Sequence, residues 1–296
     1  MDILHQNKPQ LKFMVRFCFF LIITVSAFSQ EKGFEYKYLK SSSSNQGLVL
    51  IFPGFGSRIE TLQKETPIID ECMNLGFDVL LIELYGRIIL NDQDSNDLYN
   101  IIYDIMYQNK IKDNIIAGGF SIGGNLALKF SIDSFSNKKR FIPNKVFLVD
   151  PPIDLVALYK NSKKFLLENN CLKDFEKCNE DNLIVEFLES YVGNISDIES
   201  YKEKSIFINE VETYNSLICR NFDILIFSDG QKSHYNNHLF WKSNFHSLNA
   251  FFKMLKENSD KRIVFVTRNL NKLKRNEKPH SWQIVNFDVF KSFIKN

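Results

Sequence analysis

The stretch Gly118-Gly-Phe-Ser-Ile-Gly-Gly124 follows a short apolar run, Asn114-Ile-Ile-Ala117, and leads into helical spacing over Ile122–Phe130. An apolar run that stops at glycines and resumes with helical periodicity predicts a strand, a tight turn and a helix. Within this turn the order G-x-S-x-G around Ser121 matches a nucleophile elbow in the context that the motif requires. Both flanking glycines are expected to be needed, because a Cβ at either would collide across so sharp a turn. The sequence therefore predicts that Ser121 is a nucleophile at a helix N-terminus, where backbone N–H groups stabilise negative charge.

Buried strands are predicted on both sides of this turn. Continuous apolar runs, which suit strands covered on both faces, occur at Leu48–Phe52, Asp78–Glu83, Lys145–Asp150, Phe222–Phe227 and Arg262–Thr267. Phe34–Leu39 alternates weakly and is expected to be an edge strand. Helical patterns separate the runs, at Pro67–Gly76 after the N-cap Thr66, at Leu98–Tyr107 and at Trp282–Ile294. Strands that alternate with helices predict an α/β fold, with a mostly parallel sheet and helices on both faces.

The regular alternation stops between Asp150 and Phe222. Residues 153–220 hold helical patterns, at Leu155–Leu167 and Leu183–Val192, without a convincing strand. We expect this insertion to form a helical cap above the carboxyl ends of the strands.

A second turn supports acyl-transfer chemistry. Pro53-Gly54-Phe55-Gly56 follows the strand Leu48–Phe52, and its glycines let the backbone approach a substrate closely. An acyl-transfer site needs two backbone donors for the oxyanion, one from the residue after the nucleophile and one from a second loop. We therefore expect the N–H groups of Phe55 and Ile122 to form the oxyanion hole.

The general base is expected to be His280. It follows the last predicted strand and precedes the last predicted helix, where the chain order serine, acid, histidine puts the base. His234, His238 and His246 follow an earlier strand, at the wrong edge for this role. His234 and His238 have the i, i+4 spacing of a metal pair, but no carboxylate stands at matching spacing, which favours a solvated helix face. No metal or other cofactor is predicted.

Two aspartates compete for the acid that orients the base. Asp229 lies two residues beyond the strand Phe222–Phe227 and is followed by Gly230. Asp150 lies at the tip of the preceding strand, a position that also faces the site. We favour Asp229, although either residue could simply cap a turn after its strand.

With Ser121, Asp229 and His280 in this order, the sequence resembles the α/β-hydrolase superfamily, in particular a group of exported bacterial α/β hydrolases. The matching stretches are Gly118–Gly124, Val149-Asp-Pro-Pro-Ile-Asp154 and Pro279-His-Ser-Trp-Gln-Ile-Val285. The resemblance implies a serine hydrolase that acts on a small ester or acyl substrate, most simply a carboxylic ester, without a cofactor. A peptidase of the same fold and an inactive binding module that keeps the fold are the alternatives. Many relatives have His-Gly where this chain has Pro53-Gly54. Because the oxyanion hole uses backbone N–H groups, this difference bears more on the polarity of the substrate than on activity.

The first residues predict export. Lys8, Lys12 and Arg16 precede the twelve-residue apolar run Phe17–Phe28, and the small residues Ala27 and Ser29 stand at the −3 and −1 positions of the cleavage site, the pattern of a secretory signal peptide. We expect residues 1–29 to be removed, leaving one domain, residues 30–296, in the periplasm or outside the cell. An uncleaved membrane anchor is the alternative. The remaining chain has 34 basic and 34 acidic residues, so no overall basic field points to nucleic acid.

Export affects how the cysteines are interpreted. Cys72, Cys171, Cys178 and Cys219 remain after removal of the leader, and an exported compartment permits disulfides. Cys171 and Cys178 are close enough in sequence to close a local loop, but four unpaired thiols fit the sequence equally well. The absence of a C-x-x-C pair gives no support to a zinc ribbon or a thioredoxin-like site.

Overall fold

The computed structural model describes residues 33–43, 45–169, 171, 175–209, 211, 213–232, 237–267 and 278–296. The expected signal peptide, residues 1–29, lies outside the described residues. The description below concerns the compact unit Phe34–Asn296.

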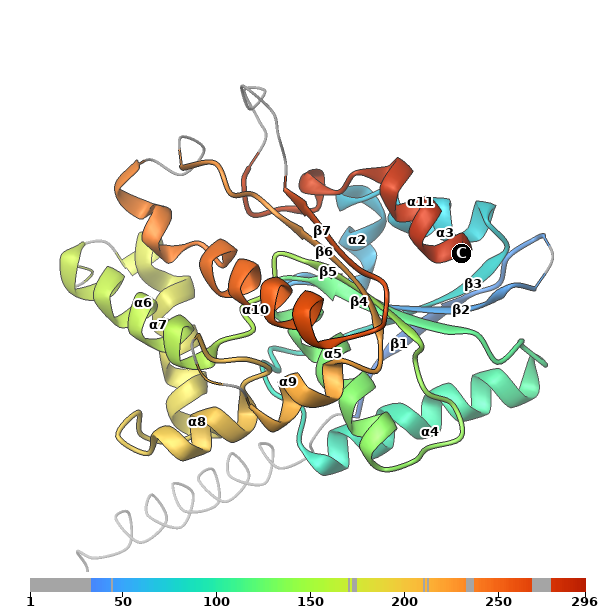
Figure 1. Ribbon diagram of the computed structural model, residues 1–296, viewed down its shortest axis with the longest axis horizontal. Helices are drawn as coiled ribbons and strands as arrows, with labels where there is room; N and C mark the ends of the chain where they lie inside the picture. Colours follow the sequence, from blue (N-terminus) through green and yellow to red (C-terminus); the bar gives the residue numbers. More distant parts are fainter. Residues whose placement is uncertain are drawn as a thin grey trace, which may run out of the picture. The chain divides into compact units, whose positions relative to one another are not determined.

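A single sheet forms the centre of this unit (Figure 1). Its described strands are β1 (Tyr36–Leu39), β2 (Gly47–Phe52), β3 (Phe77–Ile82), β4 (Ile115–Phe120), β5 (Lys145–Val149), β6 (Asp223–Ser228) and β7 (Ile263–Thr267). They lie in the order β1-β3-β2-β4-β5-β6-β7, and only the edge pair β1–β3 is antiparallel. Every run predicted as a strand therefore forms one, and the carboxyl ends of β2 to β7 meet at one edge of the sheet.

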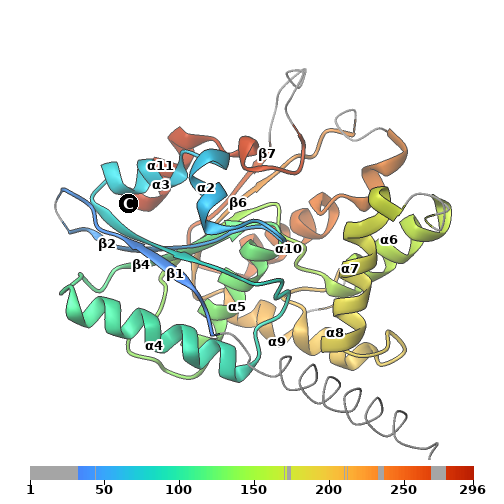
Figure 2. The same cartoon turned by 180° about the vertical axis from the view of Figure 1, so that it is seen from behind.

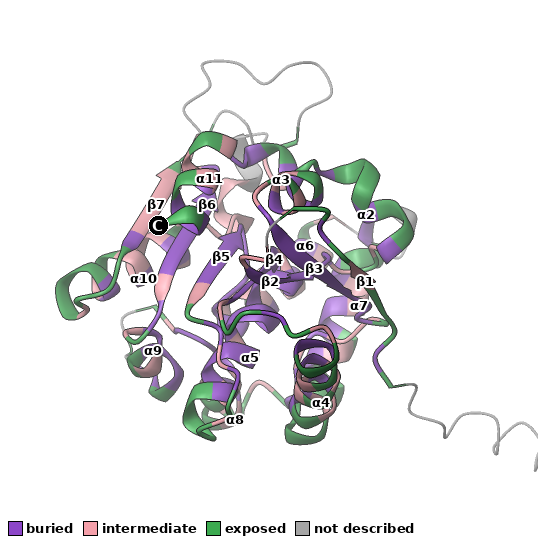
Figure 3. Cartoon of the chain, turned by 90° about the vertical axis from the view of Figure 1, so that its right-hand side faces the viewer, coloured by how far each residue is buried: buried purple, intermediate pink, exposed green. Residues whose placement is uncertain are grey.

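The strands are apolar throughout because helices cover both faces of the sheet. Every residue of β2 and β3 is buried, and Figure 3 shows the central strands almost entirely in the buried class. Burial on both faces removes the alternation of polar and apolar residues that marks a half-exposed strand. This is why continuous apolar runs located the strands in the sequence.

One face of the sheet packs against α2 (Ile59–Glu65), α3 (Ile68–Asn74) and α11 (Phe287–Lys295). The other face packs against α4 (Asp92–Gln108), α5 (Ile122–Ser136), α9 (Tyr214–Cys219) and α10 (Phe245–Asn258). Figures 1 and 2 show these two helical layers from opposite sides. The predicted α/β architecture is confirmed.

Three helix boundaries differ from the sequence prediction. The N-cap of α3 is Pro67 and not Thr66, whose Oγ1 instead accepts a hydrogen bond from the Ile68 N–H at 3.3 Å. Helix α4 begins at Asp92, six residues before the apolar pattern, because Asn91 and Asp94 form a capping box. The predicted final helix is divided into a 3-10 turn, η3 (Trp282–Ile284), and α11.

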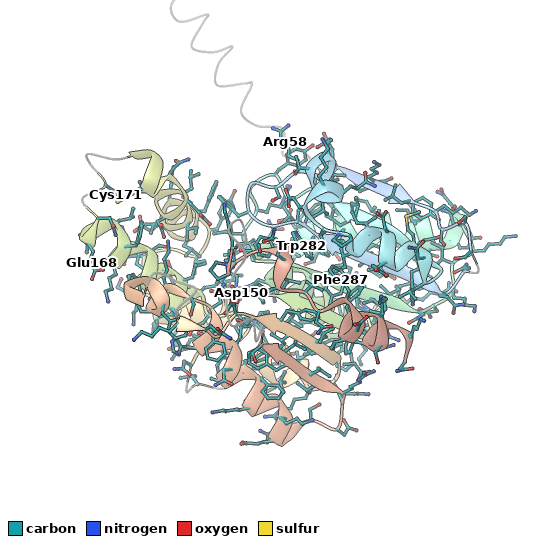
Figure 4. The ribbon with its side chains drawn as sticks, turned by 90° about the horizontal axis from the view of Figure 1, so that it is seen from above. Arg58, Asp150, Glu168, Cys171, Trp282 and Phe287 are labelled. Carbon is teal, nitrogen blue, oxygen red and sulfur yellow. A yellow bond between two sulfur atoms is a disulfide. The ribbon has the colours of Figure 1, made fainter. Side chains whose placement is uncertain are left out.

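The segment between β5 and β6 forms α6 (Leu155–Glu168), α7 (Phe175–Tyr191), α8 (Ile198–Lys204) and α9. Its later part is not confined to a cap, because Ile206, Phe207 and Cys219 pack in the core beside the strands. A disulfide joins Cys171 to Cys178 across the α6–α7 connection, and Figure 4 labels Cys171 and Glu168 at the outer end of these helices. No helix among the described residues is long and apolar enough to span a membrane.

Candidate active site

Ser121 lies at the turn between β4 and α5, as predicted. Its backbone has φ 53° and ψ −131°, a conformation that residues other than glycine rarely adopt. Its N–H donates to the carbonyl oxygen of Val149 on the neighbouring strand at 2.8 Å, which holds the strained residue in place. The side chain is therefore fixed at the carboxyl edge of the sheet and at a helix N-terminus.

The two glycines of the motif are required by close backbone contacts. A Cβ on Gly119 would overlap the carbonyl oxygen of Phe52, and a Cβ on Gly123 would overlap the carbonyl oxygens of Phe52 and Pro53. Strand β2, helix α5 and the serine turn are thus packed backbone against backbone. The steric reason predicted for these glycines is confirmed.

His280 follows the described end of β7 in sequence and contacts Ser121. Its Nε2 lies 3.0 Å from Ser121 Oγ, within hydrogen-bond distance. The imidazole packs against the ring of Phe120, the residue before the serine, with ring centroids 4.7 Å apart. The Phe120 ring also contacts Trp282, so an aromatic stack supports the histidine from the side of the elbow.

The carboxylate that contacts His280 belongs to Asp150. Asp150 Oδ2 lies 2.6 Å from His280 Nδ1, and the Asp150 side chain is only 1% exposed. Since both ring nitrogens of His280 are thereby engaged, by Asp150 and by Ser121, the prediction that Asp229 orients this histidine is wrong. Figure 4 labels Asp150 between the sheet and the helices α6 and α7.

Asp150 reaches the histidine because of its backbone conformation at the end of β5. Its φ is 49°, and its N–H donates to the carbonyl oxygen of Phe227 at 2.8 Å. The carboxylate is held in turn by Ser228, whose Oγ donates to Asp150 Oδ1 at 2.6 Å. Asn244 Nδ2 donates to the Asp150 carbonyl oxygen at 2.8 Å. These contacts leave Oδ2 directed at the imidazole.

Asp229 is equally buried, but its carboxylate accepts a hydrogen bond from within its own loop. It directly follows β6 and is 0% exposed, and its Oδ1 accepts a hydrogen bond from the Gln231 N–H at 2.9 Å. This is an Asx-type turn after a strand, the structural role that the sequence left open for either aspartate. The neighbouring Ser228, which the sequence did not indicate, is the β6 residue whose side chain bonds to the Asp150 carboxylate.

A cavity of about 350 Å³ opens beside Ser121 and His280. The residues that line it come from the turns after β2, β4 and β5, from α6 and α7, from the segment around the end of η2 (Asn237–Lys242) and the start of α10, and from the loop that contains His280. Apolar side chains in the lining are Phe55, Ile122, Pro152, Ile153, Ala157, Leu158, Ile184 and Pro279. This volume falls in the range of small-molecule sites.

Comparison with solved structures identifies proteins that share the fold of this chain. The Francisella virulence factor BioJ superposes with a TM-score of 0.54 at 16% identity, over 98% of this chain and 96% of that one. An S-formylglutathione hydrolase from Agrobacterium tumefaciens gives 0.53 at 12% identity, over 88% of each chain. The Pyrococcus furiosus esterase PF2001 gives 0.52 at 16% identity, over 88% of this chain and 91% of that one. The chain has the α/β-hydrolase fold. No protein-family model matches the sequence, and no curated protein matches it either.

Within this α/β-hydrolase fold, the residues expected to supply backbone donors lie beside Ser121. Phe55 and Ile122 both line the cavity that contains Ser121. Gly54 is packed against the Phe120 ring, since a Cβ at this glycine would lie 2.7 Å from Phe120 Cδ1. The loop after β2 is therefore held close to the elbow.

Two charged residues of the cavity lining, Asp154 and Lys242, have local partners. Asp154 caps α6 by accepting from the Ala157 N–H and also accepts from the Asn209 N–H, and burial raises the pKa of its carboxyl. Lys242 Nζ lies 2.6 Å from Asp181 Oδ2, and the Asp181 side chain is 3% exposed. Neither Asp181 nor its ion pair was identified from the sequence, since the two residues are distant in the chain.

The described residues contain no cluster of histidine, cysteine and carboxylate side chains suited to a metal ion. His234 and the side chain of His238 lie outside the described residues. His246 is exposed at the start of α10 and contacts the ring of Phe240.

Proposed function

We propose that this protein is a serine hydrolase that cleaves carboxylic esters, with Ser121 as nucleophile, His280 as base and Asp150 as acid. The observation that carries the proposal is the continuous contact from Ser121 Oγ to His280 Nε2 at 3.0 Å and from His280 Nδ1 to Asp150 Oδ2 at 2.6 Å. A serine activated by an imidazole that a buried carboxylate orients is the arrangement used for acyl transfer.

The reaction follows from these positions. His280 Nε2 accepts the proton of Ser121 as Oγ attacks the ester carbonyl, and Asp150 stabilises the imidazolium that forms. The N–H groups of Phe55 and Ile122 stabilise the oxyanion of the tetrahedral intermediate. His280 then gives its proton to the leaving alkoxide, and an acyl group remains on Ser121. Water, deprotonated by His280, attacks this acyl-enzyme, and His280 then returns the proton to the departing Ser121 Oγ, which releases the carboxylic acid and restores the serine.

Esterase neighbours of the same fold support an ester as the substrate. Covalent labelling with a fluorophosphonate tests the nucleophile, and labelling of wild-type protein but not of Ser121→Ala is expected. Activity on p-nitrophenyl esters but not on aminoacyl anilides would favour an esterase over a peptidase. Labelling that persists in Ser121→Ala, or turnover above about a tenth of the wild-type rate, would remove the assignment.

We also propose that the protein is exported after removal of residues 1–29. The basic and apolar pattern of the leader supports this, as does the disulfide between Cys171 and Cys178, because such bonds persist in oxidising compartments. Intact-mass measurement on protein from its native host is the test. A mature chain that begins at Gln30 is expected, and a chain that retains the leader would favour the anchor.

A further inference from the structure

The cavity beside Ser121 has one polar side on which, apart from Asn244 and its bond to Asp150, the proposed chemistry does not depend. It is formed by Asn161 and Ser162 from α6 and by Lys242, Ser243 and Asn244 from the end of η2 and the start of α10. The two segments are adjacent, since Asn161 Nδ2 donates to the carbonyl oxygen of Trp241 at 3.3 Å. We call these five residues the polar wall.

Two hydroxyls of the polar wall have unused hydrogen-bonding capacity. Ser162 Oγ and Ser243 Oγ are buried, and neither has a hydrogen-bond partner among the described residues. The whole Ser162 residue is 0% exposed although it borders the cavity. A buried polar group without a partner is costly, so such groups are rare in folded proteins and need an explanation. Because both hydroxyls are buried, each must turn toward the cavity to bond to a ligand group there, and such a bond would remove this cost.

The charges around the polar wall do not favour an anionic ligand. The ammonium group of Lys242 is balanced by Asp181 and lies 4.2 Å from the centroid of the Phe165 ring. Elsewhere in the cavity lining, Glu180 and Asp154 add carboxylates and Lys278 adds an ammonium group. The one charged member of the polar wall, Lys242, is thus already paired, and the wall offers a carboxylate or phosphate no unbalanced positive charge. A neutral group that both donates and accepts hydrogen bonds matches what the two serine hydroxyls offer.

We propose that the polar wall binds a neutral hydroxyl group carried by the ester substrate, on either its acyl or its alcohol portion. The apolar lining then packs against the hydrocarbon part of the same substrate. This inference rests on the proposed function, since it assigns the substrate class of that site. An alkyl group in the same place would leave Ser162 and Ser243 without partners, which is how polar pockets reject apolar analogues.

The test compares matched pairs of esters that differ only by hydroxyl groups. The acyl arm uses p-nitrophenyl ω-hydroxyhexanoate against p-nitrophenyl hexanoate, and the alcohol arm uses glycerol monobutyrate against propyl butyrate. The readout is the ratio of kcat/KM for the hydroxylated ester to that for the plain ester. We expect this ratio to exceed unity in one arm, which identifies the portion of the substrate that faces the polar wall.

Variants then connect this ratio to the two hydroxyls. Ser162→Ala and Ser243→Ala are each expected to lower the ratio about fivefold, the value of one hydrogen bond. Ser136 is exposed on α5 and provides the control, so Ser136→Ala should keep the wild-type ratio of kcat/KM values. The melting temperature of Ser162→Ala should be unchanged or raised, because the substitution removes a buried hydroxyl without a partner.

The outcomes separate this inference from the proposed function. Wild-type protein that hydrolyses the plain esters but shows no preference in either arm overturns the inference and leaves the esterase intact. A preference that both serine variants retain also overturns it, as does a lowered melting temperature in Ser162→Ala, which would indicate a structural partner for that hydroxyl. Failure to hydrolyse any ester, together with failure of Ser121 to label, overturns both.

Discussion

Replacing Asp150 with asparagine is the sharpest test of the site, because the change is nearly isosteric and removes one charge. Asp150 Oδ2 lies 2.6 Å from His280 Nδ1 and the side chain is 1% exposed, so water cannot substitute for the carboxylate. If the new amide oxygen faces the ring, the histidine keeps its tautomer but loses a charge-assisted hydrogen bond. That loss is worth roughly 1.5–3 kcal/mol, or about 10- to 150-fold in rate.

The other orientation of the amide costs more. If the amide nitrogen faces His280 Nδ1, this ring nitrogen must accept, and Nε2 then carries the proton and cannot take one from Ser121. The wrong tautomer lowers kcat by about 10⁴-fold in comparable triads. Ser228 Oγ donates to Asp150 Oδ1 at 2.6 Å, and this bond favours keeping the oxygen on its own side and the nitrogen toward the ring. We therefore expect a loss nearer to 10⁴-fold than to 10-fold.

Asp229→Asn is the matched control, since Asp229 is equally buried at the end of the adjacent strand. Its Oδ1 accepts from the Gln231 N–H, a bond that asparagine can keep, so kcat should stay within about threefold of wild type. Both variants are assayed on p-nitrophenyl butyrate, with thermal melts to confirm folding. If Asp229→Asn loses most of its activity while Asp150→Asn keeps nearly all of it, the reasoning is refuted.

Three further predictions concern other parts of the molecule. Gly123→Ala should lower stability by about 3 kcal/mol or more, measured by urea unfolding, because its Cβ would meet backbone carbonyls that cannot move aside as side chains do; a normal unfolding midpoint would contradict the packing. Burial raises the pKa of the Cys72 and Cys219 thiols, so native protein without its leader should not react with Ellman's reagent. Unfolding without reductant should expose two thiols, and reduction two more; four thiols without reductant would exclude the disulfide. Phe187→Ala removes the ring that packs edge-on against Phe55, with the ring centroids 5.9 Å apart. This change should lower kcat about three- to tenfold with little change in KM, and Phe187→Leu should recover part of the loss. A change in KM alone would mean that Phe187 acts only in binding.

The sequence located the strands and Ser121 because their signals are local, and it located His280 from its position after the last predicted strand. Continuous apolar runs report burial on both faces, and the glycines around Ser121 report a backbone contact within one short turn. The structure of the segment after β5 was harder to predict, because nothing in the local sequence indicates that Ile206, Phe207 and Cys219 pack in the core beside the strands. Long-range packing of this kind depends on the whole fold.

The acid could not be chosen from the sequence for a similar reason. Asp150 and Asp229 both follow a buried strand, and both precede residues typical of turns. What separates them is that Asp150 adopts φ 49° and that Ser228 donates to its carboxylate. The two prolines after Asp150, which restrict the chain as it leaves β5, are the only nearby sign of an unusual exit from that strand.

The geometry of the site also depends on how the sheet holds two strained residues. Ser121 and Asp150 both have positive φ, which costs of order 1–3 kcal/mol for each residue. Each is the first residue after its strand, and each donates its N–H to the last part of the next strand, Ser121 to Val149 and Asp150 to Phe227. These bonds continue the parallel ladders of β4–β5 and β5–β6 by one residue beyond the strand ends. The register of three central strands therefore sets the spacing between Ser121 and Asp150, which explains how the two strained residues remain within reach of one imidazole.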